Sequence, residues 1–266
     1  MGGASNTKLY LRDRKALARA LNVPTGLLYR AVWGSTQEEP TNSCLLEVPR
    51  MRDYLASPRI PLNIDAALEL MRPITGWFTD EEATLLLLTA SWALCDLPDE
   101  PAVVEIGSYC GRSTVLLASA IRALRPAGQV VAIDPHDGVI SLAGRPDQRG
   151  SPTYEAFLRN LTAAGMREAV QVVRERSTNV SWRQPIGLLL IDALHDYDSV
   201  RADFQHFAPW ITGGGYVAFH DHSANFPGVI QLIDEVRHTL KYGWGDHAGD
   251  LVVLQKQQPR LAQPAR

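Results

Sequence analysis

Apolar residues in the second half of the chain form short unbroken runs that alternate with longer amphipathic segments. Such runs predict strands at Ala102–Ile106, Gln129–Ile133, Val170–Val173, Gly187–Ile191, Tyr216–Phe219 and Leu251–Leu254. Strands without internal alternation, separated by helices, are typical of a parallel sheet that is covered on both faces. The pattern therefore predicts an α/β fold with a doubly wound, mostly parallel sheet.

Helices are predicted before and between these strands. Thr79 and Glu82 form a capping box, and the following Ala83–Leu94 is apolar nearly all round, so we expect a buried helix within residues 76–98. Ser151 as N-cap and Pro152 at the first helical position predict the start of another helix. Further helices are expected at Ser113–Leu124, Tyr197–Trp210 and Gly228–Leu240, the second of them ended by Gly213–Gly215.

Two short helices, Arg14–Leu21 and Leu27–Trp33, are predicted near the N-terminus. Residues 17–32 superficially match a helix-turn-helix. Packing against the main domain or a partner subunit is the favoured interpretation, because no basic cluster flanks the segment for contact with DNA.

Composition narrows the class of protein. The chain has 266 residues, 45% of them hydrophobic, which predicts one large domain or a domain with a small appendage. The net charge of -3 argues against a dedicated nucleic-acid binder, and we expect no binding to membranes either. Cys44, Cys95 and Cys110 form no zinc or disulfide pattern, which suits a reducing compartment. Met1–Tyr10 has no apolar signal segment, so we expect a cytoplasmic protein.

The first candidate site follows the first two strands, where ligands of open α/β sheets bind. Gly107 and Gly111 let the backbone approach a ligand, but the spacing is not the G-x-G-x-x-G of NAD enzymes, which disfavours that alternative. Glu105 would face an ammonium group, the loop N–H groups a carboxylate, and Asp134 the hydroxyls of a ribose. A glycine turn with incidental acids is the alternative.

Four segments together resemble a known family: Val103–Thr114, Ile133–His136, Ile191–Tyr197 and Gly213–Asp221. They are similar to the motifs of class I S-adenosylmethionine-dependent methyltransferases, and more narrowly of the bacterial branch with macrolide-sugar O-methyltransferases and cephalosporin-hydroxylase-like proteins. The resemblance covers about residues 76–256 and implies a seven-stranded Rossmann-like sheet. We expect a helical extension over 1–75 that forms an acceptor pocket or an oligomer contact, a methyltransferase domain over 76–256, and a tail over 257–266.

The resemblance also implies which residues bind S-adenosylmethionine. Asp134 would hold its ribose, and Glu175–Ser177, with Ser177 as the contact, would lie along the adenine. Ser113 and Asp192 are expected to contribute to the same site. The methionine end would contact Glu105, Gly107, Ser108 and Gly111.

A second constellation follows the fourth and fifth strands. If these strands are neighbours, as the resemblance implies, their ends lie about 5 Å apart. Two carboxylates that close repel each other unless a proton or a cation lies between them. The related sugar methyltransferases bind Mg²⁺ with acids at the positions of Asp192 and Asp221 and place a catalytic histidine at the position of His195.

One position departs from those relatives: His220 stands where they carry a third acidic ligand. His220 or His222 is therefore a candidate ligand of a divalent cation, Mg²⁺ or Mn²⁺, and absence of a metal is an alternative. A structural role at the helix start Asp198–Arg201 is the alternative for His195. Helix capping or loop bonding is the alternative for the two aspartates.

The predicted function is O-methylation of a small-molecule hydroxyl, on a sugar or natural product, by a homo-oligomeric enzyme with His195 as general base. His136 and the polar loop through Gly150 are candidates for a lid. Alternatives are a metal-independent methyltransferase acting on nitrogen or a phenol, and a catalytically silent binding subunit. Glu105, Gly107, Gly111 and Asp134 are intact, which argues against the silent subunit.

Overall fold

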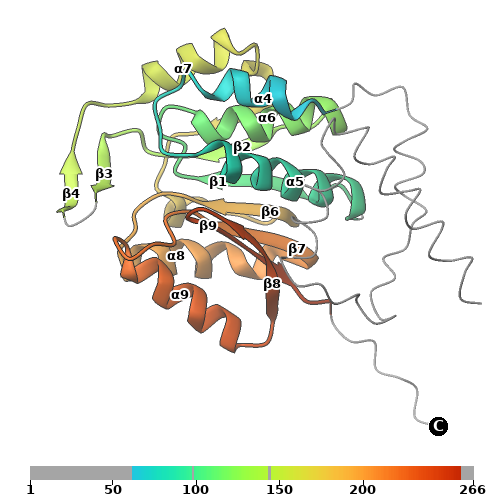
Figure 1. Ribbon diagram of the computed structural model, residues 1–266, viewed down its shortest axis with the longest axis vertical. Coiled ribbons are helices and arrows are strands. Elements are labelled where there is room, and N and C mark those ends of the chain that lie inside the picture. The colour runs from blue at the N-terminus through green and yellow to red at the C-terminus, as the bar shows by residue number, and fades with distance from the viewer. Residues whose placement is uncertain (1–61, 98, 143–144, 259–266) are drawn as a thin grey trace, which may run out of the picture.

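A computed structural model of the protein describes residues 62–97, 99–142 and 145–258 (Figure 1). The helices predicted at 14–21 and 27–33, the rest of the predicted extension up to residue 61, and the end of the tail from 259 lie outside the described residues. A central sheet with helices on both faces makes up most of the described part.

The sheet has seven strands in the order β5-β2-β1-β6-β7-β9-β8. The pairings from β5 to β7 are parallel, and β9 is antiparallel to both of its neighbours. The strands are β1 (Ala102–Ile106), β2 (Val130–Ile133), β5 (Val170–Val173), β6 (Ile186–Ile191), β7 (Ile211–Phe219), β8 (Tyr242–Ala248) and β9 (Leu251–Lys256). The predicted seven-stranded, mostly parallel sheet is confirmed, and its order reverses between β1 and β6, where this class of fold binds ligands.

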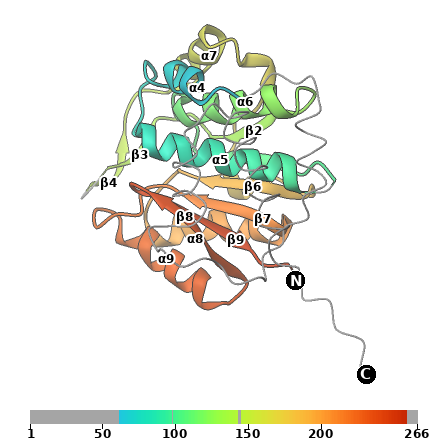
Figure 2. The same cartoon turned by 45° about the vertical axis from the view of Figure 1, so that its right-hand side comes forward.

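Successive residues of the strands face two separate apolar cores. In β1, Val103 faces the core beneath helices α4 (Ile64–Met71), α5 (Asp80–Asp96), α6 (Arg112–Leu124) and α7 (Tyr154–Ala163). Val104 faces the core beneath α8 (Tyr197–Phe207) and α9 (Pro227–His238), on the opposite side of the sheet (Figures 1 and 2). Burial on both faces explains the unbroken apolar runs of the strands. No helix in the described ranges is long and apolar enough to cross a bilayer.

Helix α5 begins as its capping box predicts. The Glu82 N–H donates to Thr79 Oγ1 at 3.3 Å, and Glu82 Oε2 accepts the Thr79 N–H at 2.7 Å. Most of the helix is buried, including the continuous run Leu85–Ser91. The predicted buried helix within residues 76–98 is therefore confirmed.

The start of α7 differs from the prediction at Ser151 and Pro152. The helix begins at Tyr154 with Thr153 as N-cap, and the Thr153 side chain makes no cap hydrogen bond. Its hydroxyl instead contacts Nδ1 of the buried His136 at 2.8 Å. The Thr153 hydroxyl is engaged by His136, a residue distant in sequence, and therefore does not cap the helix.

The end of α8 also differs from the prediction. The helix stops at Phe207, a 3-10 turn follows at Ala208–Trp210, and Gly213–Gly215 lie inside β7. Pro209 in this turn has no N–H to continue the helical ladder, which ends α8 before the glycines are reached.

Two further elements lie outside the predicted pattern. The polar stretch Pro135–Gly150 contains a hairpin of β3 (Val139–Leu142) and β4 (Arg145–Arg149). The edge strand β8 pairs only with β9, and its glycines and charged residues hide the strand pattern.

Helix α4 begins before residue 76, the predicted start of the methyltransferase domain. Its buried residues Ile64, Leu68 and Met71 belong to the same core as α5 and α6. Residues 62–75 thus pack onto the domain.

We expect Thr79→Ala to lower the free energy of unfolding by about 0.5–2 kcal/mol, because the Glu82 N–H loses its acceptor at the start of α5. Thr79→Ser keeps the hydroxyl and should retain most of the stability. Denaturant titrations of the two variants and the wild type check this, and equal stability of all three would contradict the role of the cap.

Candidate functional site

The loops after β1, β2, β6 and β7 surround one cavity of about 890 Å³. Gly107, Asp134, Asp192 and His220 each follow one of these strands directly and line it. The volume is within the range of small-molecule and cofactor sites. The structure therefore brings the two candidate sites of the sequence into a single cavity at the predicted edge of the sheet.

A close approach between neighbouring strand ends requires glycine at position 107. Its φ is +85°, and a Cβ there would lie 2.1 Å from the carbonyl oxygen of Asp192. Gly111, with φ of +92°, is the N-cap of α6, and its Cβ would lie 3.2 Å from the ring of Phe157. Gly111 lies behind the residues that line the cavity and shapes the loop from there, and its predicted ligand contact stays a prediction.

Glu105 also lies behind the cavity wall. It is fully buried, and its two carboxylate oxygens accept the hydroxyls of Ser113 and Thr114, each at 2.6 Å. Burial raises the pKa of Glu105 to about 8, against the opposing effect of these two hydrogen bonds. Glu105 ties the end of β1 to the first turn of α6, and its predicted contact with a ligand ammonium stays a prediction. Ser113 itself reaches the cavity.

Asp134 holds the loop that follows β1. The N–H groups of Ser108 and Tyr109 donate to its Oδ2 at 2.9 and 2.8 Å, and the His136 N–H donates to Oδ1 at 2.6 Å. Two loop N–H groups expected to bind a ligand carboxylate are thus directed at Asp134. Asp134 and Ser108 still line the cavity, where their oxygens can meet a ligand.

Ser177 lies in the 3-10 turn Ser177–Asn179 and lines the cavity as predicted. Its hydroxyl donates to Oδ1 of Asp203, a residue of α8 that also lines the cavity. Burial raises the pKa of Asp203 to about 6. The sequence analysis missed Asp203, although its place beside Val200, Phe204 and Phe207 on the buried face of α8 is a usable signal.

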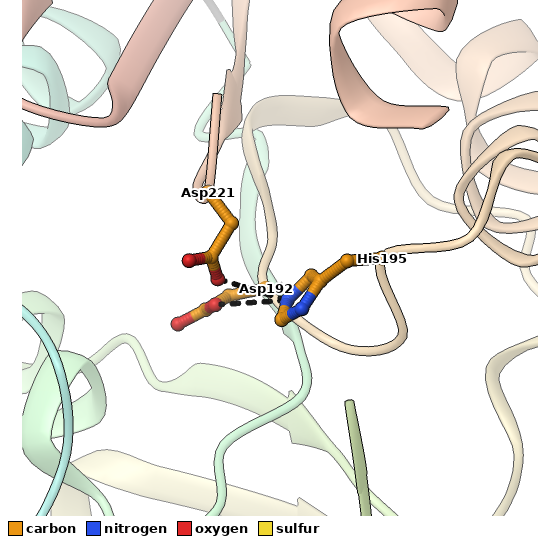
Figure 3. A group of neighbouring side chains, drawn as sticks. All are labelled: Asp192, His195 and Asp221. Atoms are coloured by element: carbon orange, nitrogen blue, oxygen red, sulfur yellow. Dashed lines mark ion pairs between the residues drawn. The ribbon is translucent and has the colours of Figure 1, made fainter. Parts of the chain in front are cut away.

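Asp192, His195 and Asp221 come together at the ends of β6 and β7 (Figure 3). His195 Nε2 lies 2.9 Å from Asp221 Oδ2 and 3.9 Å from Asp192 Oδ1. One possible ligand atom from each residue lies within 4.8 Å of the others. Two carboxylates and an imidazole are a donor set that suits a divalent cation such as Mn²⁺ or Mg²⁺, so the residues fit the predicted metal.

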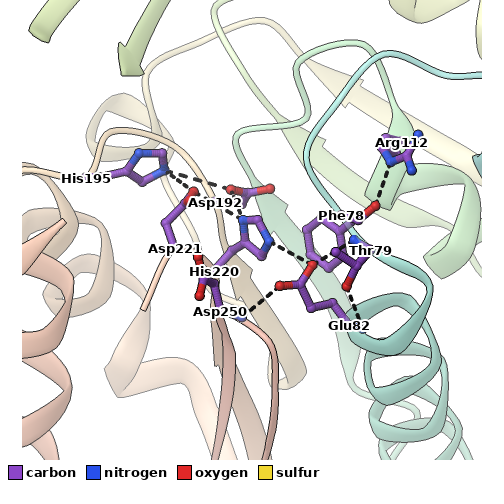
Figure 4. A network of polar contacts seen from close by, with 9 residues as sticks. All are labelled: Phe78, Thr79, Glu82, Arg112, Asp192, His195, His220, Asp221 and Asp250. Carbon is purple, nitrogen blue, oxygen red and sulfur yellow. Dashed lines mark hydrogen bonds and ion pairs between the residues drawn. The ribbon is translucent and has the colours of Figure 1, made fainter. Parts of the chain in front are cut away.

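His220 lies next to this group. Its Nδ1 is 3.1 Å from both Asp192 Oδ1 and Asp221 Oδ2, and its Nε2 is 3.5 Å from Glu82 Oε2 (Figure 4). The ring stacks on Phe78 with centroids 4.2 Å apart. Glu82 was predicted from the sequence only as part of a helix cap, and Phe78 was not predicted to belong to the site.

The two histidines and the carboxylates shift one another's pKa values. Burial alone would lower the pKa of His195, but contacts with Asp192 and Asp221 outweigh it and raise the pKa to about 9. The pKa of His220 is raised for the same reason, and the pKa of Asp221 is lowered. Both rings are therefore held in the charged form at neutral pH, and their charge compensates the two aspartates.

His222 lies apart from this cluster. Its backbone N–H donates to the Asp250 carbonyl at 2.8 Å, and its side chain does not line the cavity. The predicted metal-ligand role of His222 stays a prediction. The cap of α8 is Asp196, whose side chain accepts the Ser199 N–H at 3.0 Å, and the structural alternative for His195 also stays open.

Comparison with known proteins agrees with this geometry. Residues 104–222 match the family described as "Methyltransferase domain". The O-methyltransferase NovP superposes with a TM-score of 0.55 at 18% identity, over 67% of this chain and 81% of NovP. A SAM-dependent O-methyltransferase from Thermotoga maritima superposes with a TM-score of 0.51 at 15% identity, over 76% of this chain and 74% of its own.

The fold is therefore that of the class I methyltransferases, and the resemblance predicted from the four sequence motifs is confirmed. The family match covers the strands and loops from β1 to His222, which include Asp134, Asp192, His195 and Asp221.

The buried Glu105 predicts a pH dependence of stability. Its pKa is raised from 4.5 in the unfolded chain to about 8, so between these values the unfolded chain releases a proton that the folded protein keeps. Stability should fall as the pH rises through this window, by at most about 1.4 kcal/mol per pH unit. Glu105→Gln should show a shallower fall in denaturant titrations at pH 5 and 7.5. The exposed Glu168→Gln serves as control and should keep the wild-type slope, and equal slopes in all three proteins would contradict the prediction.

Proposed function

Taking the methyltransferase domain as the premise, we propose that this S-adenosylmethionine-dependent enzyme methylates a hydroxyl of a small molecule, a sugar or another natural product, with the help of a divalent cation. The observation that carries the proposal is the cluster of Asp192, His195 and Asp221 inside the cavity that Asp134 and Ser177 also line. The names of the two similar structures, both O-methyltransferases, support the choice of oxygen as the methyl acceptor.

The cofactor is assigned to the side of the cavity near β1, β2 and the turn at Ser177. Asp134 is the acceptor for ribose hydroxyls, because its carboxylate lies at the end of β2 and lines the cavity. Ser177 and Asp203 provide polar atoms for the adenine. Ser108 and Ser113 provide hydroxyls for the methionine end, and the Ser108 hydroxyl has no protein partner in the described part of the chain.

His195 is the proposed general base. A sulfonium methyl group is already activated, so the enzyme must position the acceptor and remove its proton. Beside Asp192 and Asp221, however, His195 keeps its own proton at neutral pH, because His220 alone does not compensate both carboxylates. It can accept a proton from the substrate only when another positive charge compensates Asp192 and Asp221, and the cofactor sulfonium and a divalent cation both qualify.

Asp192 and Asp221 are the residues proposed to hold the cation, with His220 as a further candidate ligand, which leaves the role of the base to His195. When bound, such an ion supplies the positive charge that lowers the pKa of a hydroxyl.

The acceptor is assigned to the side of the cavity formed by the start of α5 and the segment before it. Thr75, Gly76 and Trp77 line this side, and Trp77 is 58% exposed. An exposed tryptophan at a cavity mouth offers a flat apolar surface for a ring. These residues support the proposal that the N-terminal part of the chain helps to form the acceptor pocket.

A metal-independent methyltransferase is the second candidate. The observation that favours it is His220, whose charged ring already lies 3.1 Å from an oxygen of each aspartate. In this candidate, His220 and the sulfonium supply all the compensating charge.

We expect calorimetry to show micromolar binding of S-adenosylhomocysteine to the wild type. Asp134→Ala should weaken binding about 10- to 100-fold, because one lost charge-assisted hydrogen bond costs about 1.5–3 kcal/mol. Asp234→Ala changes an exposed acid of α9 and should bind as the wild type does. A folded wild type without any heat of binding would refute the proposed cofactor.

Excess chelator should abolish turnover and leave binding of S-adenosylhomocysteine nearly intact, and Mg²⁺ or Mn²⁺ should restore the rate. Asp192→Asn and Asp221→Asn should each resemble the chelated enzyme, because each removes a charged ligand. Full activity in chelator would exclude the metal and leave the second candidate.

His195→Ala should bind the cofactor but lose about 10²–10⁴-fold in rate, the usual effect of removing a general base. His238→Ala, an exposed histidine of α9, is the matched control and should keep the wild-type rate. An unchanged rate in His195→Ala would leave an enzyme that works by positioning alone. Single-turnover assays with saturating cofactor separate this effect from binding.

A further inference from the structure

Glu82 connects three parts of the chain that are far apart in sequence. Its Oε2 accepts the Thr79 N–H at 2.7 Å, at the start of α5, and its Oε1 accepts the Asp250 N–H at 2.7 Å, in the turn between β8 and β9. The same Oε2 lies 3.5 Å from His220 Nε2, at the end of β7 (Figure 4). The Glu82 side chain is only 4% exposed.

These contacts exceed what a helix cap requires. A capping box uses one carboxylate oxygen and works at the protein surface, whereas burial of a carboxylate costs free energy unless its oxygens are bonded. Here the turn at Gly249 is shaped around the carboxylate, since a Cβ on Gly249 would lie 2.5 Å from Glu82 Oε1. The turn and the cap together hold both carboxylate oxygens in fixed positions.

The ring of His220 is in turn held from several sides. Phe78, one residue before the N-cap of α5, stacks on its face at an interplanar angle of 11°. Glu82 faces Nε2, and Asp192 and Asp221 face Nδ1. A rotation of the ring would move its nitrogens away from these carboxylates.

We propose that Glu82 is a positioning residue of the reaction: it fixes the ring of His220 so that Nδ1 stays between Asp192 and Asp221. Through His220 it keeps the two aspartates in the arrangement that faces His195. This inference rests on the proposed function for its effect on turnover, but the orientation of His220 can be measured without any acceptor.

The test compares Glu82→Gln and Glu82→Ala with the wild type. Gln retains the size of the side chain and can still serve a capping box, so it should fold even where Ala does not. We expect kcat to fall about 10- to 100-fold in Glu82→Gln, the usual range for the loss of a residue that orients a functional side chain. Affinity for S-adenosylhomocysteine and the KM for S-adenosylmethionine should change less than twofold.

The orientation of His220 provides a second measurement. Long-range ¹H–¹⁵N spectra of the histidine rings, assigned with His220→Gln, should show displaced His220 ring signals in Glu82→Gln and unchanged signals for His238. Asn63→Ala is the stability control, because it removes the side-chain cap of α4, where Asn63 Oδ1 accepts the Ala66 N–H at 3.1 Å. This control should lose stability but keep both kcat and the His220 signals.

Wild-type kcat together with unchanged His220 signals in folded Glu82→Gln would overturn the inference. An equal fall of kcat in Asn63→Ala and Glu82→Gln, in proportion to the stability that each variant loses, would overturn it too. If the wild type transfers no methyl group to any hydroxyl, the proposed function fails, while displaced His220 signals would still support the positioning role of Glu82.

Discussion

Three carboxylates converge on one buried imidazole ring, and the rest of the site depends on how their charge is compensated. Glu82, Asp192 and Asp221 approach His220 from α5, β6 and β7. Unpaired carboxylates with so little exposure would be strongly destabilising, so the cluster requires cations. His195 and His220 supply positive charge in the structure. The carboxylates stabilise the charged form of each ring and so raise its pKa.

Two carboxylic acids, Glu105 and Asp134, have different roles at neighbouring strand ends. Glu105 at the end of β1 is sealed under the loop by Ser113 and Thr114, and its raised pKa favours the neutral form. Asp134 after β2 binds three backbone N–H groups and still reaches the cavity. Glu105 is fully buried and supports the loop, whereas Asp134 lines the cavity and can meet a ligand. The two acids differ in how deeply they are buried and in which hydrogen-bond donors surround them.

The sequence predicts the strands because apolar runs mark buried strands, and the ends of parallel strands meet at one edge of a sheet. The resemblance to a known family supplies the adjacency of the fourth and fifth strands, which places Asp192 near Asp221. Glu82 and Asp250 escape prediction because only tertiary packing brings them to the cavity. A glycine required by packing, such as Gly111 against Phe157, looks the same in sequence as one required by a ligand.

The first turn of α6 joins the two sides of the cavity that we propose for the cofactor and the acceptor. Ser113 and Thr114 bind Glu105 beneath the loop after β1. The neighbouring Arg112 donates to the carbonyl oxygen of Phe78 at 2.9 Å (Figure 4). It also donates to the carbonyl oxygen of Ile74 at 2.7 Å. Phe78 is also the residue that stacks on His220. A shift of this turn would therefore move the loop after β1, the segment before α5 and the ring of His220 together. In-line methyl transfer requires donor and acceptor to be fixed relative to each other, and a single helix start that holds both sides meets this requirement.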